Sequence, residues 1–173
     1  METKPNIVTL HNLLDYNAGR FTSAEAEVKS GLAEWIKEAS SMQLKAVLQK
    51  YLDFATAHIQ RIDRFVEDES LTFINSSDTV MQALIRDTVE NLSFCLDAAV
   101  KDACLLASVQ CINHYKISKY GTAAAYANNL GLDKAAALFH ELEINEKHID
   151  DRLSQLAEYE INTKAKTPVV LPG

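Results

Sequence analysis

The chain has 173 residues and a formal net charge of −7, which suits one domain with a substantial core. Its lysines and arginines form no dense cluster that could follow a phosphate backbone, so we expect no nucleic-acid partner. No stretch has the length and apolarity of a signal peptide or a membrane span, and we therefore expect a cytoplasmic protein without a membrane partner.

The distribution of proline predicts an all-α fold. Residues 6–167 contain no proline, the strongest helix breaker, and are rich in alanine, leucine, glutamate and lysine. We expect a short N-terminal tail over residues 1–8, a helical bundle over residues 9–161 and a flexible tail over residues 162–173.

The first two long helices are expected on either side of a serine pair. The first follows Thr9 and covers residues 10–39, with a bend at Gly19. Ser40, as the cap, and Gln43 form a capping box that starts the second long helix, which runs through residue 67.

A short helix is expected over residues 79–94, in the crossover between the second and third long helices. The third long helix covers residues 98–128, and Gly131 can end it in the left-handed conformation. Asp133 can cap the last helix, over residues 134–161. Four long helices with short connections predict a four-helix bundle.

The third long helix carries polar side chains where a helix should be driest. Residues 103–115 have no formal charge, yet Gln110, Asn113 and His114 lie among apolar residues. Buried polar groups need partners. These side chains therefore either bond to the backbone and to each other in the core, or belong to a site.

Four-helix bundles can hold two metal ions between carboxylates, with two Glu-x-x-His pairs supplying the histidines. That spacing is absent, because neither His58 nor His114 has a glutamate three residues before it. Candidate acids remain at Glu25 on the first helix and at Glu146 and Asp150 on the last. Each of these acids alone is more often a solvated or salt-bridged residue.

Two long segments of the chain resemble the YciF-like branch of ferritin-like stress proteins. Residues 24–63, AEAEVKSGLAEWIKEASSMQLKAVLQKYLDFATAHIQRID, resemble that family's first two helices. Residues 102–157 are similar to its last two, and their strongest element is H-Y-x-I-x-x-Y-G-T, at residues 114–122. The resemblance implies a ferritin-like bundle, commonly a homodimer, connected with bacterial stress responses, with a metal site in some members and no settled reaction.

By position, Glu25 matches the acid of the family's AE motif, and Glu146 and Asp150 match acids on its last helix. The departures lie on three helices. Where the family has V-E-H-Y-E, this chain has I-N-H-Y-K, so Asn113 and Lys116 replace both glutamates. Phe54 lies in the segment that replaces the family's acidic HL-x-E-T, and Asn145 replaces one acid of its EEEK run.

Charge decides what such a site can hold. Two divalent cations need about four carboxylates, so losing two or three leaves excess positive charge in the core. One expectation is therefore a core without metal, in which Asn113, His114 and Lys116 satisfy Glu25 and Glu146. Lys116 would then supply internally the charge that a metal supplies in relatives.

The other expectation is one loosely bound iron or other divalent ion. Glu25, Glu146 and Asp150 would hold it together with His58 or His114. The first arrangement favours a non-catalytic, stress-related homodimer without a cofactor, acting through a protein partner that the sequence does not identify. The second favours a metal-dependent oxidase or peroxide-scavenging protein of the ferritin and rubrerythrin class.

Overall fold

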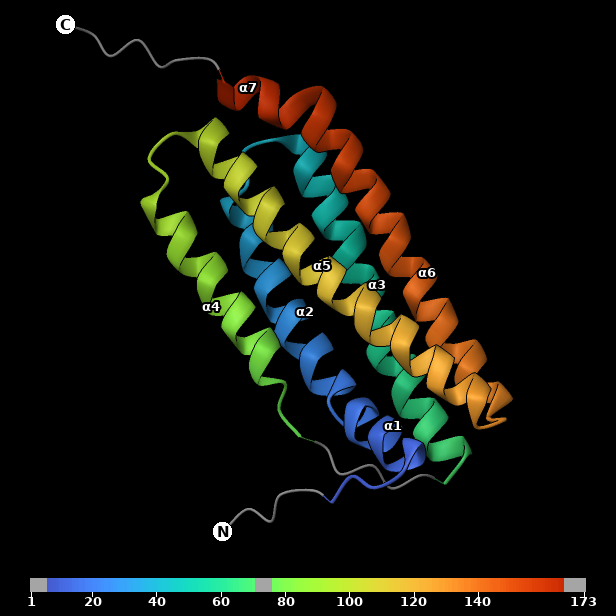
Figure 1. The fold of residues 1–173 in the computed structure, drawn as a ribbon. Coiled ribbons are helices and arrows are strands. Elements are labelled where there is room, and N and C mark those ends of the chain that lie inside the picture. Colours follow the sequence, from blue (N-terminus) through green and yellow to red (C-terminus); the bar gives the residue numbers. More distant parts are fainter. Residues whose placement is uncertain (1–5, 71–75, 167–173) are drawn as a thin grey trace, which may run out of the picture.

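The computed structural model describes residues 6–70 and 76–166, and over these ranges the chain forms helices and no strand (Figure 1). The helices are α1 (Leu10–Ala18), α2 (Phe21–Glu38), α3 (Met42–Asp68), α4 (Thr79–Phe94), α5 (Ala98–Asn129), α6 (Asp133–Leu156) and α7 (Asn162–Lys166), with a π-helical turn (Ala157–Ile161) before α7. No helix in these ranges is long and apolar enough to cross a membrane.

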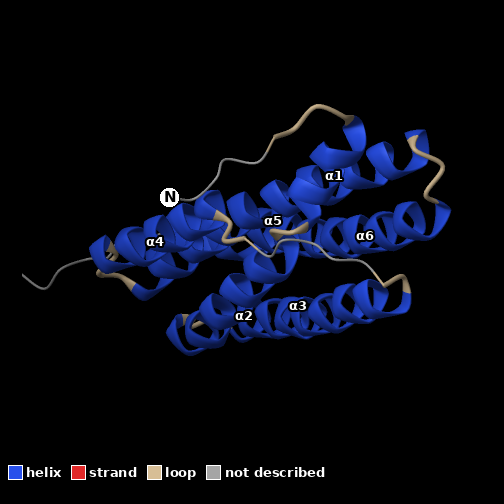
Figure 2. Ribbon diagram, turned by 90° about the horizontal axis from the view of Figure 1, so that it is seen from below, coloured by secondary structure: helices blue, strands red, loops and turns tan. Residues whose placement is uncertain are grey.

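The four long helices, α2, α3, α5 and α6, form a bundle. Helix α2 packs against α3, and α5 packs against α6. Figure 2 shows these two pairs as facing layers. Helix α4 lies in the crossover from α3 to α5 and packs against α2 and α5, which confirms the predicted order of elements.

The first predicted helix is two helices. The bend expected at Gly19 is a break that separates α1 from α2. The carbonyl oxygen of Gly19 accepts a hydrogen bond from the backbone N–H of Ser76 at 3.0 Å. The break therefore also holds the chain that leads into α4.

The second predicted long helix is α3, and its cap lies one residue later than predicted. A residue distant in sequence fixes where this helix starts. Asp102 on α5 accepts the backbone N–H groups of Ser40 and Ser41, each at 2.8 Å. The cap is consequently Ser41, whose hydroxyl accepts the N–H of Leu44 at 3.2 Å. The predicted capping box with Ser40 was wrong.

The turn between α5 and α6 follows a helix-ending motif. Gly131 has φ of +68°, as predicted, and the N–H of Leu132 bonds to the carbonyl of Ala127 at 2.9 Å. This turn leads straight into α6, so Asp133 is the first helical residue and Leu132 precedes it. The predicted cap at Asp133 was therefore wrong.

The C-terminal region stays helical beyond the predicted end. Ile161 is buried in the core, and Lys164 pairs with Glu160 at 2.8 Å. Residues 162–166 form α7 instead of the expected flexible tail, and residues 167–173 lie outside the described residues. At the other end, residues 6–8 precede α1 as expected, and residues 1–5 also lie outside the description.

Two apolar cores fill the bundle. One lies among α2, α3, α5, α6 and α4 and includes Val28, Leu48, Ile112 and Ile149. The other is nearer α1 and the turn from α5 to α6 and includes Phe21, Ile62, Ala124 and Leu142. On each long helix, buried polar residues stand between the two sets. The apolar interior is therefore interrupted by one polar layer.

Candidate functional site

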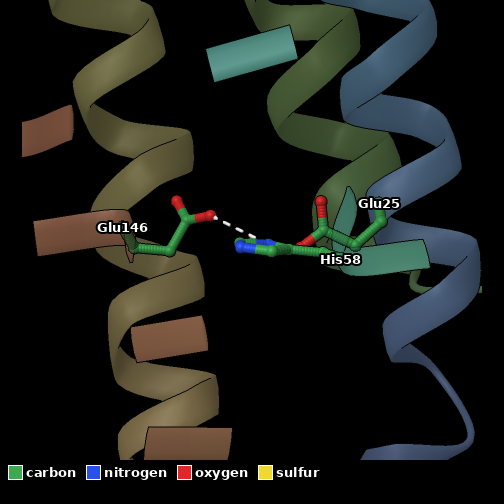
Figure 3. A group of neighbouring side chains, drawn as sticks. All are labelled: Glu25, His58 and Glu146. Carbon is green, nitrogen blue, oxygen red and sulfur yellow. Dashed lines mark hydrogen bonds and ion pairs between the residues drawn. The ribbon is translucent and has the colours of Figure 1, made fainter. Parts of the chain in front are cut away.

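Each long helix contributes one acidic or basic side chain to the polar layer. Glu25 comes from α2, His58 from α3, Lys116 from α5 and Glu146 from α6, and none of the four is more than 3% exposed. Figure 3 shows Glu25, His58 and Glu146 converging from separate helices. Groups of this kind are almost never buried without partners, so their contacts define the site.

Lys116 links the two acids. Its Nζ lies 2.9 Å from Oε2 of Glu25 and 2.6 Å from Oε1 of Glu146. The same ammonium lies 4.7 Å from the centre of the Tyr51 ring, within range of a cation–π interaction. Burial works against the charge, but the two carboxylates outweigh it and raise the pKa of Lys116. The side chain is therefore a permanent internal cation at neutral pH.

His58 lies beside the same two acids. Its Nδ1 is 3.0 Å from Oε1 of Glu25 and 3.5 Å from Oε1 of Glu146. An ionised carboxylate can only accept, so we assign the hydrogen to Nδ1. Nε2 then accepts from the amide nitrogen of Asn145, 3.2 Å away. The Phe54 ring lies parallel to the imidazole ring, with 6.1 Å between the ring centres.

Two hydroxyl groups and one amide complete the layer. The Tyr51 hydroxyl donates to Oε2 of Glu146 at 2.7 Å, and Nδ2 of Asn113 donates to the same oxygen at 2.8 Å. The Tyr120 hydroxyl donates to Oε1 of Glu25. Burial and the nearby carboxylate charges raise the pKa of both tyrosines well above 10.0, so both remain hydrogen-bond donors.

The two acids have opposite pKa shifts. Burial opposes ionisation of Glu25, but Lys116, His58 and Tyr120 together lower its pKa to about 2. Burial and the charge of Glu25 raise the pKa of Glu146, and the attraction of Lys116 offsets only part of this. Glu25 therefore stays ionised, and Glu146 is the acid that takes up a proton more readily.

The structure brings together three of the five candidate metal ligands, Glu25, His58 and Glu146. It places the other two, His114 and Asp150, at the edge between α5 and α6, where Nε2 of His114 lies 2.8 Å from Oδ1 of Asp150. His114 is 63% exposed. Two residues along a helix differ by about 200°, so His114 points outward where Lys116 points inward. The expectation that His114 contacts Glu25 and Glu146 was therefore wrong.

Asn113 and Lys116 do contact the buried acids as that expectation stated. Tyr51 and Tyr120 were missed as donors to the site. Their spacing carried a signal, because Tyr51 lies seven residues before His58 and Tyr120 four residues after Lys116, which places each pair on one helical face.

Among the described residues, the polar layer has ligands for one metal ion and not for two. Ligand atoms of Glu25, His58 and Glu146 lie within 4.8 Å of one another, as a single metal ion would require. The ammonium of Lys116 already lies against both of these carboxylates. Two divalent ions would need about four carboxylates where the layer supplies two. A dinuclear centre therefore does not fit this polar layer.

Comparisons with known proteins agree with the resemblance. A family model described as a domain of unknown function (DUF892) matches residues 9–166. The chain is 33% identical over 162 residues to protein YciF of Escherichia coli (strain K12), an alignment that covers 93% of this chain and 98% of that protein.

Solved structures show the same bundle. The crystal structure of the E. coli stress protein YciF matches with a TM-score of 0.85 and 32% identity over 93% of this chain and 100% of that chain. YcfI from Rhodopseudomonas palustris matches with a TM-score of 0.83 and 25% identity over 88% and 97%. A protein of Anabaena variabilis with DJ-1/ThiJ/PfpI-like and ferritin-like domains shares the fold alone, with a TM-score of 0.62 and 16% identity over 96% of this chain and 42% of that chain. The predicted all-α, ferritin-like bundle is confirmed.

Proposed function

Because the chain belongs to the YciF-like family described as DUF892, we propose that it is a non-catalytic ferritin-like protein of the stress response, without a resident metal ion. The relative in E. coli is named a stress protein, and the relative in R. palustris is described only as a proposed structural protein. In this proposal the chain acts in the cytoplasm as a homodimer, through a protein partner.

One observation carries the proposal. The ammonium of Lys116 lies within 2.9 Å of both buried acids, where a cation must balance their charge. A metal ion would have to displace this ammonium and leave it buried without a partner, which is strongly unfavourable. The Lys116 ammonium therefore neutralises the carboxylates as a metal ion would, but it can neither change oxidation state nor bind oxygen.

The alternative is a metal-dependent oxidase or peroxide-scavenging protein. The convergence of Glu25, His58 and Glu146 within 4.8 Å favours it, because these are metal-ligand types in a workable arrangement. Cooperative oxygen chemistry would need a second ion about 3.5–4 Å from the first. No further carboxylate reaches this layer from the described residues.

Metal content separates the two functions. The protein is incubated anaerobically with Fe(II), loose ions are removed by gel filtration, and iron is counted by elemental analysis. We expect no more iron in the wild-type protein than in E25Q, in which one central carboxylate is neutral. Near two irons per chain, present in the wild type and lost in E25Q, would overturn the proposal and would make oxygen or peroxide consumption the next assay.

The proposed homodimer has its own support and its own test. Near the turn from α4 to α5, Phe94 is 71% exposed and Leu96 is 99% exposed, although both are large and apolar. Such side chains together indicate a contact surface more often than one alone does. Light scattering should give twice the 19.2 kDa mass of the chain for the wild type and a monomer mass for L96D.

A further inference from the structure

Helix α1, the last turns of α3 and the start of α6 meet at the end of the bundle opposite α7 (Figure 1). Residues of these three helices line a cavity. Its volume is about 370 Å³, within the range of small-molecule sites. None of the side chains of the polar layer lines it, so it is a separate feature.

The inner wall of the cavity is apolar and partly aromatic. Leu14 of α1, Phe65 of α3, and Ala135 and Phe139 of α6 line it. Phe65 and Phe139 meet edge to face with ring centres 6.5 Å apart. Leu14, Ala135 and Phe139 are themselves buried, so the wall is held in place by the core behind it. The body of a fitting ligand is therefore apolar.

The mouth of the cavity is negatively charged. Among the described residues that line it, Asp15, Glu69 and Asp133 carry carboxylates and Lys134 carries the one ammonium, which leaves a charge of −2 if histidine is counted as neutral. Glu69 accepts from Lys134 at 2.6 Å. Asp15 is 3.0 Å from Nδ1 of His11. Lys134 offsets the charge of Glu69, and Asp15 and Asp133 remain as the two charges of the excess when histidine is counted as neutral.

The first turn of α6 contributes positive charge at the mouth, but less than the negative charge of the carboxylates. No side chain within residues 6–70 and 76–166 caps this turn, so its backbone N–H groups add partial positive charge at the mouth. A helix N-terminus is equivalent to roughly half an elementary charge. This does not offset a charge of −2. The faces of phenylalanine rings also attract cations, so the balance at the mouth favours a positively charged group.

We propose that this cavity binds an amphipathic organic ammonium compound. Its apolar body lies between Leu14, Phe65 and Phe139, and its ammonium lies at the mouth among Asp15, Glu69 and Asp133. The proposal is independent of the metal content of the polar layer, because the two places share no residue.

Three probes with the same ring test the sign of the preferred charge. 2-Phenylethylamine, 2-phenylethanol and 3-phenylpropanoate are titrated into ¹⁵N-labelled protein at neutral pH, and binding is followed by amide chemical shifts. We expect the amine to bind about tenfold more tightly than the carboxylate, with the alcohol between them. The shifted amides should belong to α1, the end of α3 and the start of α6.

Variants at the mouth test the assignment. In K134M the ammonium that pairs with Glu69 is gone, and the amine should bind about threefold more tightly. In E69Q one negative charge is lost, and the amine should bind about threefold more weakly while the alcohol is unaffected. Lys134 is 76% exposed, so K134M does not threaten the fold, and a gain in affinity cannot come from unfolding.

Two further variants serve as controls. A135M fills the cavity without changing its charge and should weaken all three probes. D53N changes an exposed acid away from this cavity and should change none of them. The proposal is overturned if the alcohol or the carboxylate binds as tightly as the amine, if K134M weakens the amine, or if the shifted amides lie elsewhere.

Discussion

The substitution K116M tests whether the buried ammonium holds the polar layer together. Methionine keeps an unbranched side chain but removes the charge that lies within 2.9 Å of Glu25 and Glu146. Removing one partner of a buried ion pair typically costs about 3–5 kcal/mol. Proton uptake by Glu146, whose pKa is already raised, relieves part of this cost. For a chain of this length we expect the melting temperature to fall by about 10 °C.

The same variant should gain a metal site. Glu25, His58 and Glu146 keep their ligand atoms within 4.8 Å of one another, and Oδ1 of Asn113 is buried without a hydrogen-bond partner among the described residues. A single divalent cation can then replace the lost charge. We expect K116M to bind one Co²⁺ or Zn²⁺ per chain and the wild type to bind none at the same concentration. At a hundred times Kd, the ion should restore about 2.7 kcal/mol.

The assay combines visible absorption of bound Co²⁺, elemental analysis and thermal melting with and without Zn²⁺. K119M is the matched control, because Lys119 lies on the same helix but contacts the Tyr115 ring instead of the acids. It should behave as the wild type does. A K116M protein that melts with the wild type, or a wild type that binds Zn²⁺ as tightly as K116M, would refute the electrostatic role given to Lys116.

Further predictions concern pH, helix glycines and a buried cap. The pKa of Glu25 is lowered from 4.5 to about 2, so its ionisation stabilises the fold above pH 4.5 by about 3 kcal/mol, and this contribution is lost as the pH falls toward 2. Denaturation from pH 7 to pH 2 should therefore show wild type and E25Q converging in acid. In G31A the new Cβ would lie 2.7 Å from the Trp35 ring, and melting should show a loss of about 1–3 kcal/mol. G121A meets the carboxylate end of the Glu143 side chain, at 3.0 Å, and should gain up to about 1 kcal/mol of helix propensity in the same assay. D102A removes the acceptor of two backbone N–H groups before α3 and should cost about 3 kcal/mol in urea unfolding.

The sequence predicted those parts of the fold whose causes are local. The bounds of α4 were predicted to the residue, and Gly131 adopts the left-handed conformation, because helical periodicity and glycine at a helix end act over a few residues. The start of α3 was missed because its cause is not local. Asp102 lies more than sixty residues away and binds the turn before it, so nothing within residues 40–43 distinguishes one serine from the other.

The candidate site also has a part that local sequence predicted and a part that depends on how the helices pack. Lys116 stands where the family has glutamate, a difference of two charge units, and this difference led to one of the two expectations, that Lys116 contacts the acids. Which histidine joins them depends on how α3 is rotated against α2 and α6. His114 could have been set aside from the sequence, because it lies about 200° around the helix from Lys116. The burial of His58 beside the acids depends on helix packing, which the sequence alone did not predict.

The reverse substitution tests whether two residues account for the missing metals. N113E/K116E restores the two glutamates of the family's E-H-Y-E pattern and, with Glu25 and Glu146, supplies the four carboxylates that two divalent ions need. Without metal, glutamate at 113 would meet Glu146 where the amide of Asn113 now donates at 2.8 Å, and like charges would repel in a buried layer. We therefore expect the double variant to be unstable alone and to fold with Mn²⁺ or Fe²⁺ at two ions per chain. The single variant K116E should bind one ion at most. If the double variant folds equally well without metal, or binds no more than K116E, then the rest of the layer, and not these two residues, excludes the second ion.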